Sequence, residues 1–311
     1  MPANGARATS AGMLYYLSLQ DLLEHGDKVE PVTQVSSPSY GKESIELIGY
    51  QLILSDPRAR LIVAEKRPLN LGYCIGNFFY QMAGVDTVKD IAYYNPIAAK
   101  FSDDGNSLHG TYGPRIFKQI RSVISLLQAD PATRRAVITI FDGRIDHEPS
   151  NDIPCPISMQ FLVRGTKLVC VTSFRSQNVL MVYPYDIFLF TMLHEWVAVH
   201  SGYEIGPHVQ LNGSYHIYET EREMAGEVNR GRIETSRMPA MSMVNENQWF
   251  NIRTYERQVR RWGQDLCPCP VMPAATRYWT GIMRWLLVFA ECKRRDQHHL
   301  RDINIFDQLW Q

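Results

Sequence analysis

The chain lacks a long apolar run, a surplus of charge of either sign and a dense set of cysteines. No stretch approaches the ~20 apolar residues that a membrane-spanning helix needs, so we expect no membrane partner. Lysine plus arginine and aspartate plus glutamate both number 32, which leaves no basic surplus for binding a nucleic acid polymer. A small anion held by a few arginines remains compatible with this balance.

The six cysteines are sparse and irregularly spaced, and the first residues, MPANGARATSAG, lack the charged-then-apolar pattern of a signal peptide. We therefore expect a cytoplasmic protein. Cys267 and Cys269 with His298 and His299 leave a metal site open as an alternative. CPCP lacks the usual two-residue spacing between zinc ligands, so no metal is expected.

No linker rich in Pro, Ser, Gly or charge divides the middle of the chain, so we expect one domain over residues 1–311, with a divergent region from about residue 220. Hydrophobic spacing predicts helices and strands in a mixed order, without regular βαβ alternation, which is typical of an α+β fold. The predicted helices cover residues 13–25, 71–84, 114–128, 186–202 and 277–295. The predicted strands cover residues 44–54, 134–141, 158–163, 167–174 and 208–219.

Two of these segments have distinctive features. The segment 158–174 reads as a hairpin whose turn is Arg164-Gly165-Thr166. The segment 186–202 is apolar almost all round, which indicates a buried central helix that Asp186 could cap and Gly202 could end.

Cys155 lies in NDIPCPISMQF, between two prolines and immediately before a predicted strand. The prolines fix the backbone and remove two amide donors, so the sulfur is presented from a rigid corner, although a lone cysteine is more often a small buried apolar residue. Arg175 and Ser176 in SFRSQNV suit a phosphate, because guanidinium and hydroxyl groups both donate hydrogen bonds. Arg134 and Arg135 form a second cationic pair, and surface ion pairs are the plain alternative for both pairs.

Several motifs in order resemble the thymidylate synthase superfamily: RRAVITIF, IPC before a strand, FRSQNV, YPYDIFLFTML and NGSYHIY. They span roughly residues 110–220, and SIELIGYQ and NFFYQMAG extend the resemblance upstream. It implies an α+β fold with a central mixed sheet and a long buried helix. It also implies a homodimer with shared active sites, a pyrimidine nucleoside monophosphate substrate and 5,10-methylenetetrahydrofolate as the one-carbon donor.

The resemblance also implies roles for individual residues. The Cys155 thiolate would add to C6 of the pyrimidine ring, and Arg175 and Ser176 would hold the nucleotide phosphate. Arg134 and Arg135 would reach the partner's phosphate across the dimer interface. Tyr112 corresponds to a family tyrosine near the reacting C5. His216 and Tyr218 correspond to the side chains that bind the ribose.

Asp186 in YPYDIF stands where family members that act on uracil resemble PFN. An Asn amide accepts from N3–H and donates to O4, whereas cytosine presents an amino donor at N4 and a bare acceptor at N3. A carboxyl group accepts from the amine and can supply a proton to N3, so Asp186 favours cytosine. The chain thus resembles the CMP and dCMP 5-hydroxymethylases, including those of nucleoside-antibiotic pathways, in which water quenches an exocyclic methylene on C5.

The chain departs from the family at several positions. Asn77 stands where a catalytic glutamate is expected, and Asn cannot act as a general base. Asn178 replaces an aspartate that contacts the folate pterin, and Pro156 replaces the histidine beside the nucleophile. The segment SSPSYG, residues 36–41, lacks the family's N-terminal phosphate arginine.

These departures keep two other functions open. One is a non-catalytic nucleotide-binding paralogue, against which the retained Cys155 argues because binding alone needs no nucleophile. The other is a methylase or hydroxymethylase of UMP or dUMP, which requires Asp186 to be a helix cap only.

Overall fold

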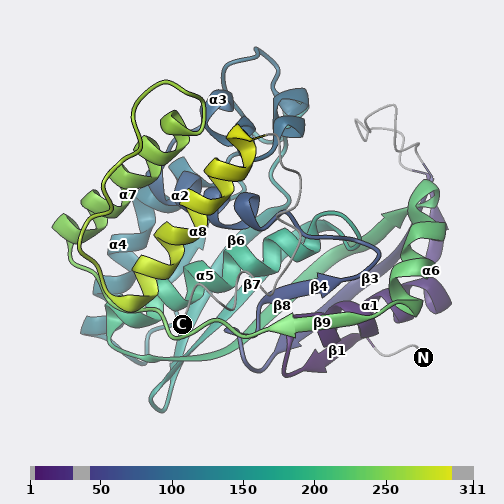
Figure 1. The fold of residues 1–311 in the computed structure, drawn as a ribbon. Helices are drawn as coiled ribbons and strands as arrows, with labels where there is room; N and C mark the ends of the chain where they lie inside the picture. The colour runs from purple at the N-terminus through teal and green to yellow at the C-terminus, as the bar shows by residue number, and fades with distance from the viewer. Residues whose placement is uncertain (1–3, 31–42, 296–311) are drawn as a thin grey trace.

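A seven-stranded mixed sheet forms the centre of the protein, whose computed structural model describes residues 4–30 and 43–295 (Figure 1). The strand order is β1-β3-β8-β7-β6-β5, with β2 paired to β3. β1 and β3 are parallel, as are β7 and β8, and the other neighbours are antiparallel. The strands are β1 (Gly5–Ala8), β2 (Asp27–Val29), β3 (Ser44–Leu54), β5 (Val137–Thr139), β6 (Pro156–Arg164), β7 (Lys167–Asn178) and β8 (Glu204–Tyr218). A separate two-stranded sheet joins β4 (Leu61–Ala64) to β9 (Ile233–Ser236). The α+β prediction is confirmed.

The β6–β7 hairpin turns at Gly165, whose φ of 61° is a left-handed conformation that favours glycine. β5 is shorter than the predicted 134–141 strand because its regular pairing with β6 ends where Thr139 meets Ser158. There the carbonyl oxygen of Ile157 accepts hydrogen bonds from the amides of both Ile140 and Phe141, at 2.8 and 3.1 Å. This irregularity directly follows Cys155 in the chain.

Helix α5 (Tyr183–Ser201) is buried along almost its whole length and packs against β7 and β8 (Figure 1). This confirms the predicted buried central helix. It begins earlier than residue 186, because Pro184 is well suited to the first helical turn. It ends at Gly202, which adopts the left-handed conformation (φ 86°) common at helix C-termini.

The other predicted helices are also present. They are α1 (Ala11–His25), α2 (Leu71–Ala83), α4 (Gly113–Ala129) and α8 (Arg277–Arg294). Further helical elements are α3 (Val88–Ala92), α6 (Arg222–Arg230), α7 (Glu246–Trp262) and two short 3₁₀ turns, Pro96–Phe101 and Glu219–Glu221. Within the described residues, none of the helices combines the length and the apolar character that crossing a bilayer requires.

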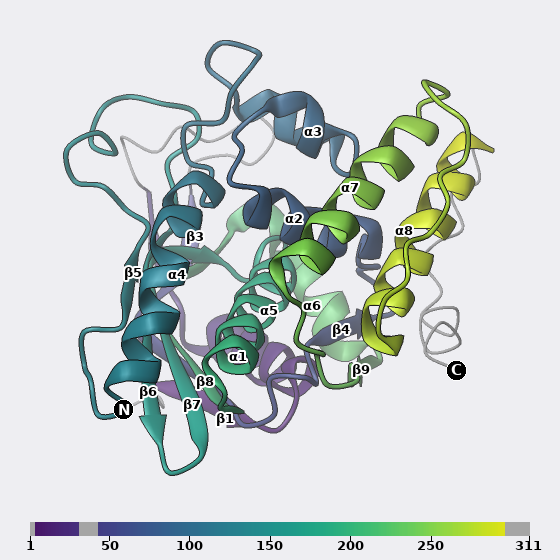
Figure 2. The same ribbon diagram turned by 90° about the vertical axis from the view of Figure 1, so that its left-hand side faces the viewer.

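The helices α7 and α8 lie side by side and cover α2 (Figures 1 and 2). Aromatic rings fill this contact: Phe79 stacks on Trp249 at 5.5 Å between ring centroids, and Trp249 lies 4.7 Å from Trp196 of α5 and 5.5 Å from Trp279. The C-terminal helices thus share one hydrophobic core with the motif-bearing part of the chain. This favours the single-domain organisation, which stays a prediction.

Candidate active site

Arg175 and Cys155 are held together by the start of β6 and the end of β7. The Arg175 guanidinium donates hydrogen bonds to the carbonyl oxygens of Pro154 and Ile153, each at 3.0 Å, and its Nη2 lies 3.9 Å from the Cys155 sulfur. The Arg175 amide also donates to the Cys155 carbonyl at 2.9 Å. Because the arginine bonds the backbone on the N-terminal side of the sulfur, it fixes the loop and places a positive charge beside the thiol.

The Cys155 thiol is half-buried, and this environment raises its pKa. Burial raises the pKa to about 11, Arg175 acts in the opposite direction, and the carboxyl groups of Asp186 and Asp152 raise it further. The thiol of the free protein is therefore protonated at neutral pH. Nucleophilic attack requires that a proton leave it.

Asp186 lies in the first turn of α5 with only 4% of its surface exposed. Gln177 donates a hydrogen bond of 2.9 Å to its carboxylate, and Gln210 in turn donates to the Gln177 side-chain carbonyl at 3.0 Å. Burial raises the pKa of Asp186 to about 7, while the Gln177 hydrogen bond lowers it. The N-cap residue of α5 is Val182, so the expectation that Asp186 caps the helix is wrong: its carboxylate is directed to Gln177.

Tyr112 lies immediately before α4 and packs against Phe190 of α5, with 5.9 Å between the ring centroids. Burial raises the pKa of its phenol well above the ordinary value, and the charges of Asp186, Cys155 and Asp152 raise it further. The structure thus brings the predicted Tyr112, Cys155 and Asp186 into one electrostatic group. It adds Asp152, which the sequence interpretation missed.

Ser176 and His216 lie on the neighbouring strands β7 and β8, where the Ser176 hydroxyl approaches Nδ1 of His216 at 3.5 Å. Burial lowers the pKa of His216 to about 4, with Arg175 as a further cause, so the imidazole is neutral at pH 7. Tyr218 makes an edge contact with its ring at 5.7 Å. A neutral imidazole can both donate and accept, which is suited to a sugar hydroxyl.

Asn178 uses both ends of its amide within the protein. Its oxygen accepts from the Met181 amide at 2.7 Å, and its nitrogen donates to the Glu221 carboxylate at 2.8 Å. The other oxygen of Glu221, Oε1, is buried and accepts no hydrogen bond in the described structure. Asn178 therefore positions a carboxylate that retains a free buried acceptor atom.

Two predicted groups have no contact with Cys155 in the part of the chain that the structure describes. Asn77 of α2 is buried, and its side-chain oxygen accepts from Gln81 at 2.9 Å within the same helix. Arg134 and Arg135 are exposed just before β5, and neither guanidinium has a hydrogen bond or ion pair with a described residue. Their side chains remain available to an external anion.

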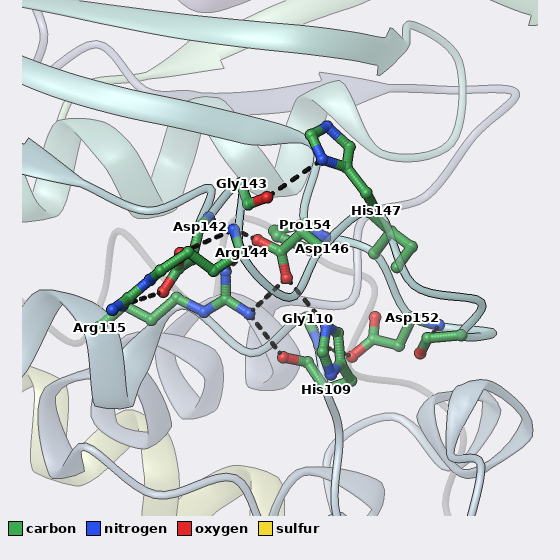
Figure 3. Close-up of polar contacts among 12 residues, drawn as sticks. His109, Gly110, Arg115, Asp142, Gly143, Arg144, Asp146, His147, Asp152 and Pro154 are labelled. Carbon is green, nitrogen blue, oxygen red and sulfur yellow. Dashed lines mark hydrogen bonds and ion pairs between the residues drawn. The ribbon is translucent and has the colours of Figure 1, made fainter.

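The loop before Cys155 is anchored by charged residues that the sequence interpretation did not single out (Figure 3). The buried Asp146 carboxylate accepts from Arg115 at 2.5 and 2.9 Å and lies 2.9 Å from His109. Arg115 also donates to the His109 carbonyl oxygen at 3.0 Å, and the Gly110 amide donates to Asp152 at 2.8 Å. The acidic Asp152 three residues before the nucleophile was the available sequence signal.

Within residues 4–30 and 43–295, no group of three or more His, Cys, Asp and Glu side chains is placed to hold a metal. Cys267 donates to the Gln258 carbonyl oxygen at 3.5 Å. The other proposed ligands of that alternative, His298 and His299, lie outside the described residues, as does the segment 36–41.

The sequence is similar to several curated phage proteins. It is 26% identical over 235 residues to the deoxyuridylate hydroxymethyltransferase of Delftia phage PhiW-14, covering 67% of this chain and 65% of the relative. The corresponding enzyme of Bacillus phage SP01 is 26% identical over 223 residues, with 66% and 56% covered. That of Pseudomonas phage M6 is 27% identical over 171 residues, with 52% and 49% covered. The matched region thus spans less than two thirds of the length of each of these relatives.

The family comparison covers a larger part of this chain. The sequence profile of the thymidylate synthase family matches residues 19–262, a range that contains β7, β8, α5 and all the candidate site residues above. The match reaches past residue 220, into the region expected to diverge. On this match, together with the ordered cysteine, arginine and β7–α5 motifs, the chain belongs to the thymidylate synthase family.

Proposed function

We propose that this protein is a pyrimidine nucleotide C5-hydroxymethylase that transfers a one-carbon unit from 5,10-methylenetetrahydrofolate to CMP or dCMP. One observation carries the proposal: the Cys155 sulfur lies 3.9 Å from the Arg175 guanidinium and interacts electrostatically with the buried Asp186 carboxyl group. A nucleophile, an anion-binding group and a base-reading group therefore meet at one place. The names of the three phage relatives support the reaction class.

Covalent activation of the ring is the role of Cys155. Addition of its thiolate to C6 makes C5 nucleophilic, as C5 substitution requires. Arg175 contributes in two ways: its positive charge stabilises the thiolate, and its guanidinium binds the nucleotide phosphate together with Ser176. His216 and Tyr218 bind the sugar, and they can do so whether it is ribose or deoxyribose.

Recognition of the base is the role of Asp186. Its pKa of about 7 means that the carboxyl group retains a proton in much of the protein at neutral pH. The protonated form offers one acceptor for the N4 amine of cytosine and one donor for N3, where electron density develops when the thiolate adds to C6. Gln177 holds the carboxyl group in one orientation for this contact.

Folate supplies a one-carbon unit at the oxidation level of formaldehyde when it is bound. The residues present suit such a ligand, because Oε1 of Glu221 is a buried acceptor without a partner among the described residues and would accept a hydrogen bond from a pterin N–H group. Asn178 holds this glutamate at 2.8 Å, so Glu221 would supply the acidic group that position 178 lacks.

A homodimer with shared sites is part of the proposal. On β7 and β8, side chains that face α5 are buried, whereas the alternating Val169, Val171, Val209 and Leu211 are half-buried or exposed. The helices that cover the sheet lie on the other side (Figure 1). Among the described residues nothing covers this apolar sheet face, which suits a second copy of the chain, and the Arg134 and Arg135 guanidinium groups bond no described residue and are available to reach the partner's phosphate.

A second candidate substrate is UMP or dUMP. A neutral carboxylic acid has one donor and one acceptor, as an Asn amide does, so protonated Asp186 can also pair with N3–H and O4 of uracil. The pKa of about 7 and the names of the phage relatives favour this alternative. Cytosine remains the first proposal, because Asp186 replaces the Asn that the resemblance associates with uracil.

The test is to incubate the purified protein with methylenetetrahydrofolate and, separately, CMP, dCMP, UMP and dUMP, and to follow each nucleotide by mass spectrometry. A hydroxymethyl gain on a cytosine nucleotide alone supports the proposal, and Cys155→Ala is the control that should abolish it. A gain on uracil nucleotides establishes the second candidate. No change on any nucleotide would point to the non-catalytic paralogue.

A further inference from the structure

Asp152 is an acidic residue beside the nucleophile to which neither the resemblance nor the mechanism above assigns a role. It lies three residues before Cys155, on the loop whose carbonyl oxygens bind Arg175. Oδ2 accepts the Gly110 amide at 2.8 Å, while Oδ1 accepts no hydrogen bond from a described residue. Burial raises the pKa of this carboxyl group, against the opposing effects of the Gly110 amide and His109.

The position of Asp152 relates two parts of the site. The Gly110 amide that it binds lies two residues before Tyr112, and Asp152 interacts electrostatically with both Tyr112 and Cys155. The Asp186 carboxyl group also interacts electrostatically with both of these side chains. Asp152 therefore lies close to the place where the reacting carbon would be.

The backbone around Asp152 is held rigidly (Figure 3). Arg115 donates to the carbonyl oxygens of His109 and Ile140, at 3.0 and 2.6 Å, and to both oxygens of the buried Asp146. These bonds tie the segment before Tyr112 to the loop that leads to Cys155. A carboxylate on such a scaffold is positioned in the way that proton transfer requires.

Hydroxymethylation needs a proton acceptor close to C5, and three of the candidate residues described above cannot supply it. Asn77, at the position of the family glutamate, cannot exchange a proton at neutral pH. The phenol of Tyr112 has a pKa well above the ordinary value, and the Asp186 carboxyl group is engaged by Gln177 and by the pyrimidine. Asp152 has a free carboxylate oxygen.

We propose that Asp152 is the general base that removes a proton from the water molecule that attacks the one-carbon unit on C5. This inference rests on the proposed function and extends it with a catalytic residue. The water oxygen forms a bond to the exocyclic methylene carbon while the water proton passes to Asp152. The π electrons of the exocyclic double bond move into the ring and re-form the C5–C6 double bond. The C6–sulfur bond breaks, and its electron pair leaves with the Cys155 thiolate.

The test compares wild type with Asp152→Asn, which keeps an acceptor for the Gly110 amide but cannot take a proton. Three quantities are measured with the nucleotide that wild type uses: release of tritium from C5, formation of the hydroxymethyl product, and trapping of the methylene group by added 2-mercaptoethanol. The thiol is a stronger nucleophile than water and needs no protein base, so its thioether product reports the same intermediate.

Asp103→Asn is the matched control. Asp103 accepts from the Ser150 hydroxyl at 2.6 Å and the Asn151 amide at 2.9 Å, so this variant disturbs the same loop but leaves the Asp152 carboxylate intact. If Asp152→Asn does not fold, as judged by loss of nucleotide binding, Asp152→Ser takes its place. The serine also lacks the proton-accepting group.

The inference predicts that Asp152→Asn loses ~10²–10⁴-fold in hydroxymethyl product but keeps tritium release and thioether formation, whereas Asp103→Asn keeps all three. Product formation within about threefold of wild type would overturn it. Loss of tritium release together with product would also overturn it, because Asp152 would then act before the water step. If wild type modifies no nucleotide, the proposed function fails first, and the inference fails with it.

Discussion

Gln177 donates its side-chain amide to the buried carboxylate of Asp186 at 2.9 Å, while its own carbonyl oxygen accepts from Gln210. Gln210 also donates to Asn212 at 2.8 Å, so the orientation of the Gln177 amide is set by the neighbouring strand β8. Because the Gln177 side-chain oxygen is held by Gln210, the atom that faces Asp186 is the Gln177 amide nitrogen, which is a donor. The carboxyl group that is proposed to read the base is thus oriented by the sheet.

Replacing Gln177 by Met should weaken base recognition without abolishing turnover. The apolar side chain removes the one hydrogen bond that lowers the Asp186 pKa, so the pKa should rise above about 7. Loss of a hydrogen bond to a buried group costs ~1–3 kcal/mol, which is roughly a fivefold to 150-fold change in kcat/KM. The measurement is kcat/KM for cytosine and uracil nucleotides against pH.

Two results would decide this prediction. The ratio of cytosine to uracil kcat/KM should fall in Gln177→Met, and the pH profile should shift upward. Asn178→Asp, a change at the adjacent residue, is the control that leaves the Gln177–Asp186 hydrogen bond in place. An unchanged ratio and profile in Gln177→Met would show that Gln177 has only a packing role.

Asp186→Asn should stabilise the folded protein, in a manner that depends on pH. The carboxyl pKa is about 7 in the folded chain against an ordinary 3.8, so at intermediate pH the folded chain binds a proton that the unfolded chain has lost. Stability therefore falls as pH rises from about 4 to about 7 and is constant above that range. The substitution removes this penalty, which is up to roughly 4 kcal/mol near pH 8 and close to zero near pH 4.

Urea unfolding midpoints at several pH values measure this effect. Asp27→Asn, at an exposed position on β2, is the control and should change stability little. An equal gain at about pH 4 and about pH 8 would contradict the prediction, because a packing effect does not depend on proton binding. The same variant should shift nucleotide preference from cytosine toward uracil.

Local patterns in the sequence were sufficient for most of the fold and for part of the site. The β6–β7 hairpin and the buried helix α5 were predicted because neighbouring residues determine each of them. The grouping of Cys155 with Arg175 was predicted from ordered motifs. The role of Asp186 as a helix cap was a wrong expectation, because Pro184 allowed the helix to begin earlier and the carboxylate bonds Gln177 instead.

The rest of the site depends on contacts between distant segments. Asp152 binds the Gly110 amide across 42 positions, and Gln210 meets Gln177 across 33. The irregular pairing after Cys155 determines how the loop enters β6. No local propensity specifies such contacts, because they arise only when β6, β7 and β8 pair and α4 packs against the sheet.

Alkylation of Cys155 by iodoacetamide should be slow at neutral pH. Its rate should rise about tenfold per pH unit as the pH approaches the thiol pKa of about 11, because only the thiolate reacts. Arg175→Ala removes the positive charge that lowers this pKa, so it should slow alkylation at a given pH. Asp152→Asn removes a negative charge that raises it, so it should speed alkylation.

Mass spectrometry of the alkylated peptides separates the cysteines. The exposed Cys269 provides an internal reference in the same sample, and its rate should be the same in wild type and both variants. Faster alkylation of Cys155 in Arg175→Ala would contradict the electrostatic role of the arginine.

Mixing two inactive variants should restore activity if the sites are shared across a dimer. In Cys155→Ala with Arg135→Ala, each heterodimer contains one site with both an intact cysteine and an intact partner arginine. Random exchange makes half of the dimers mixed, so recovery should approach roughly a quarter of wild type. Cys155→Ala mixed with Arg175→Ala is the matched control and should give no recovery, because Arg175 contacts Cys155 of its own chain. Equal recovery in the two mixtures, or none in either, would contradict the proposed contribution of Arg135 to the partner's phosphate.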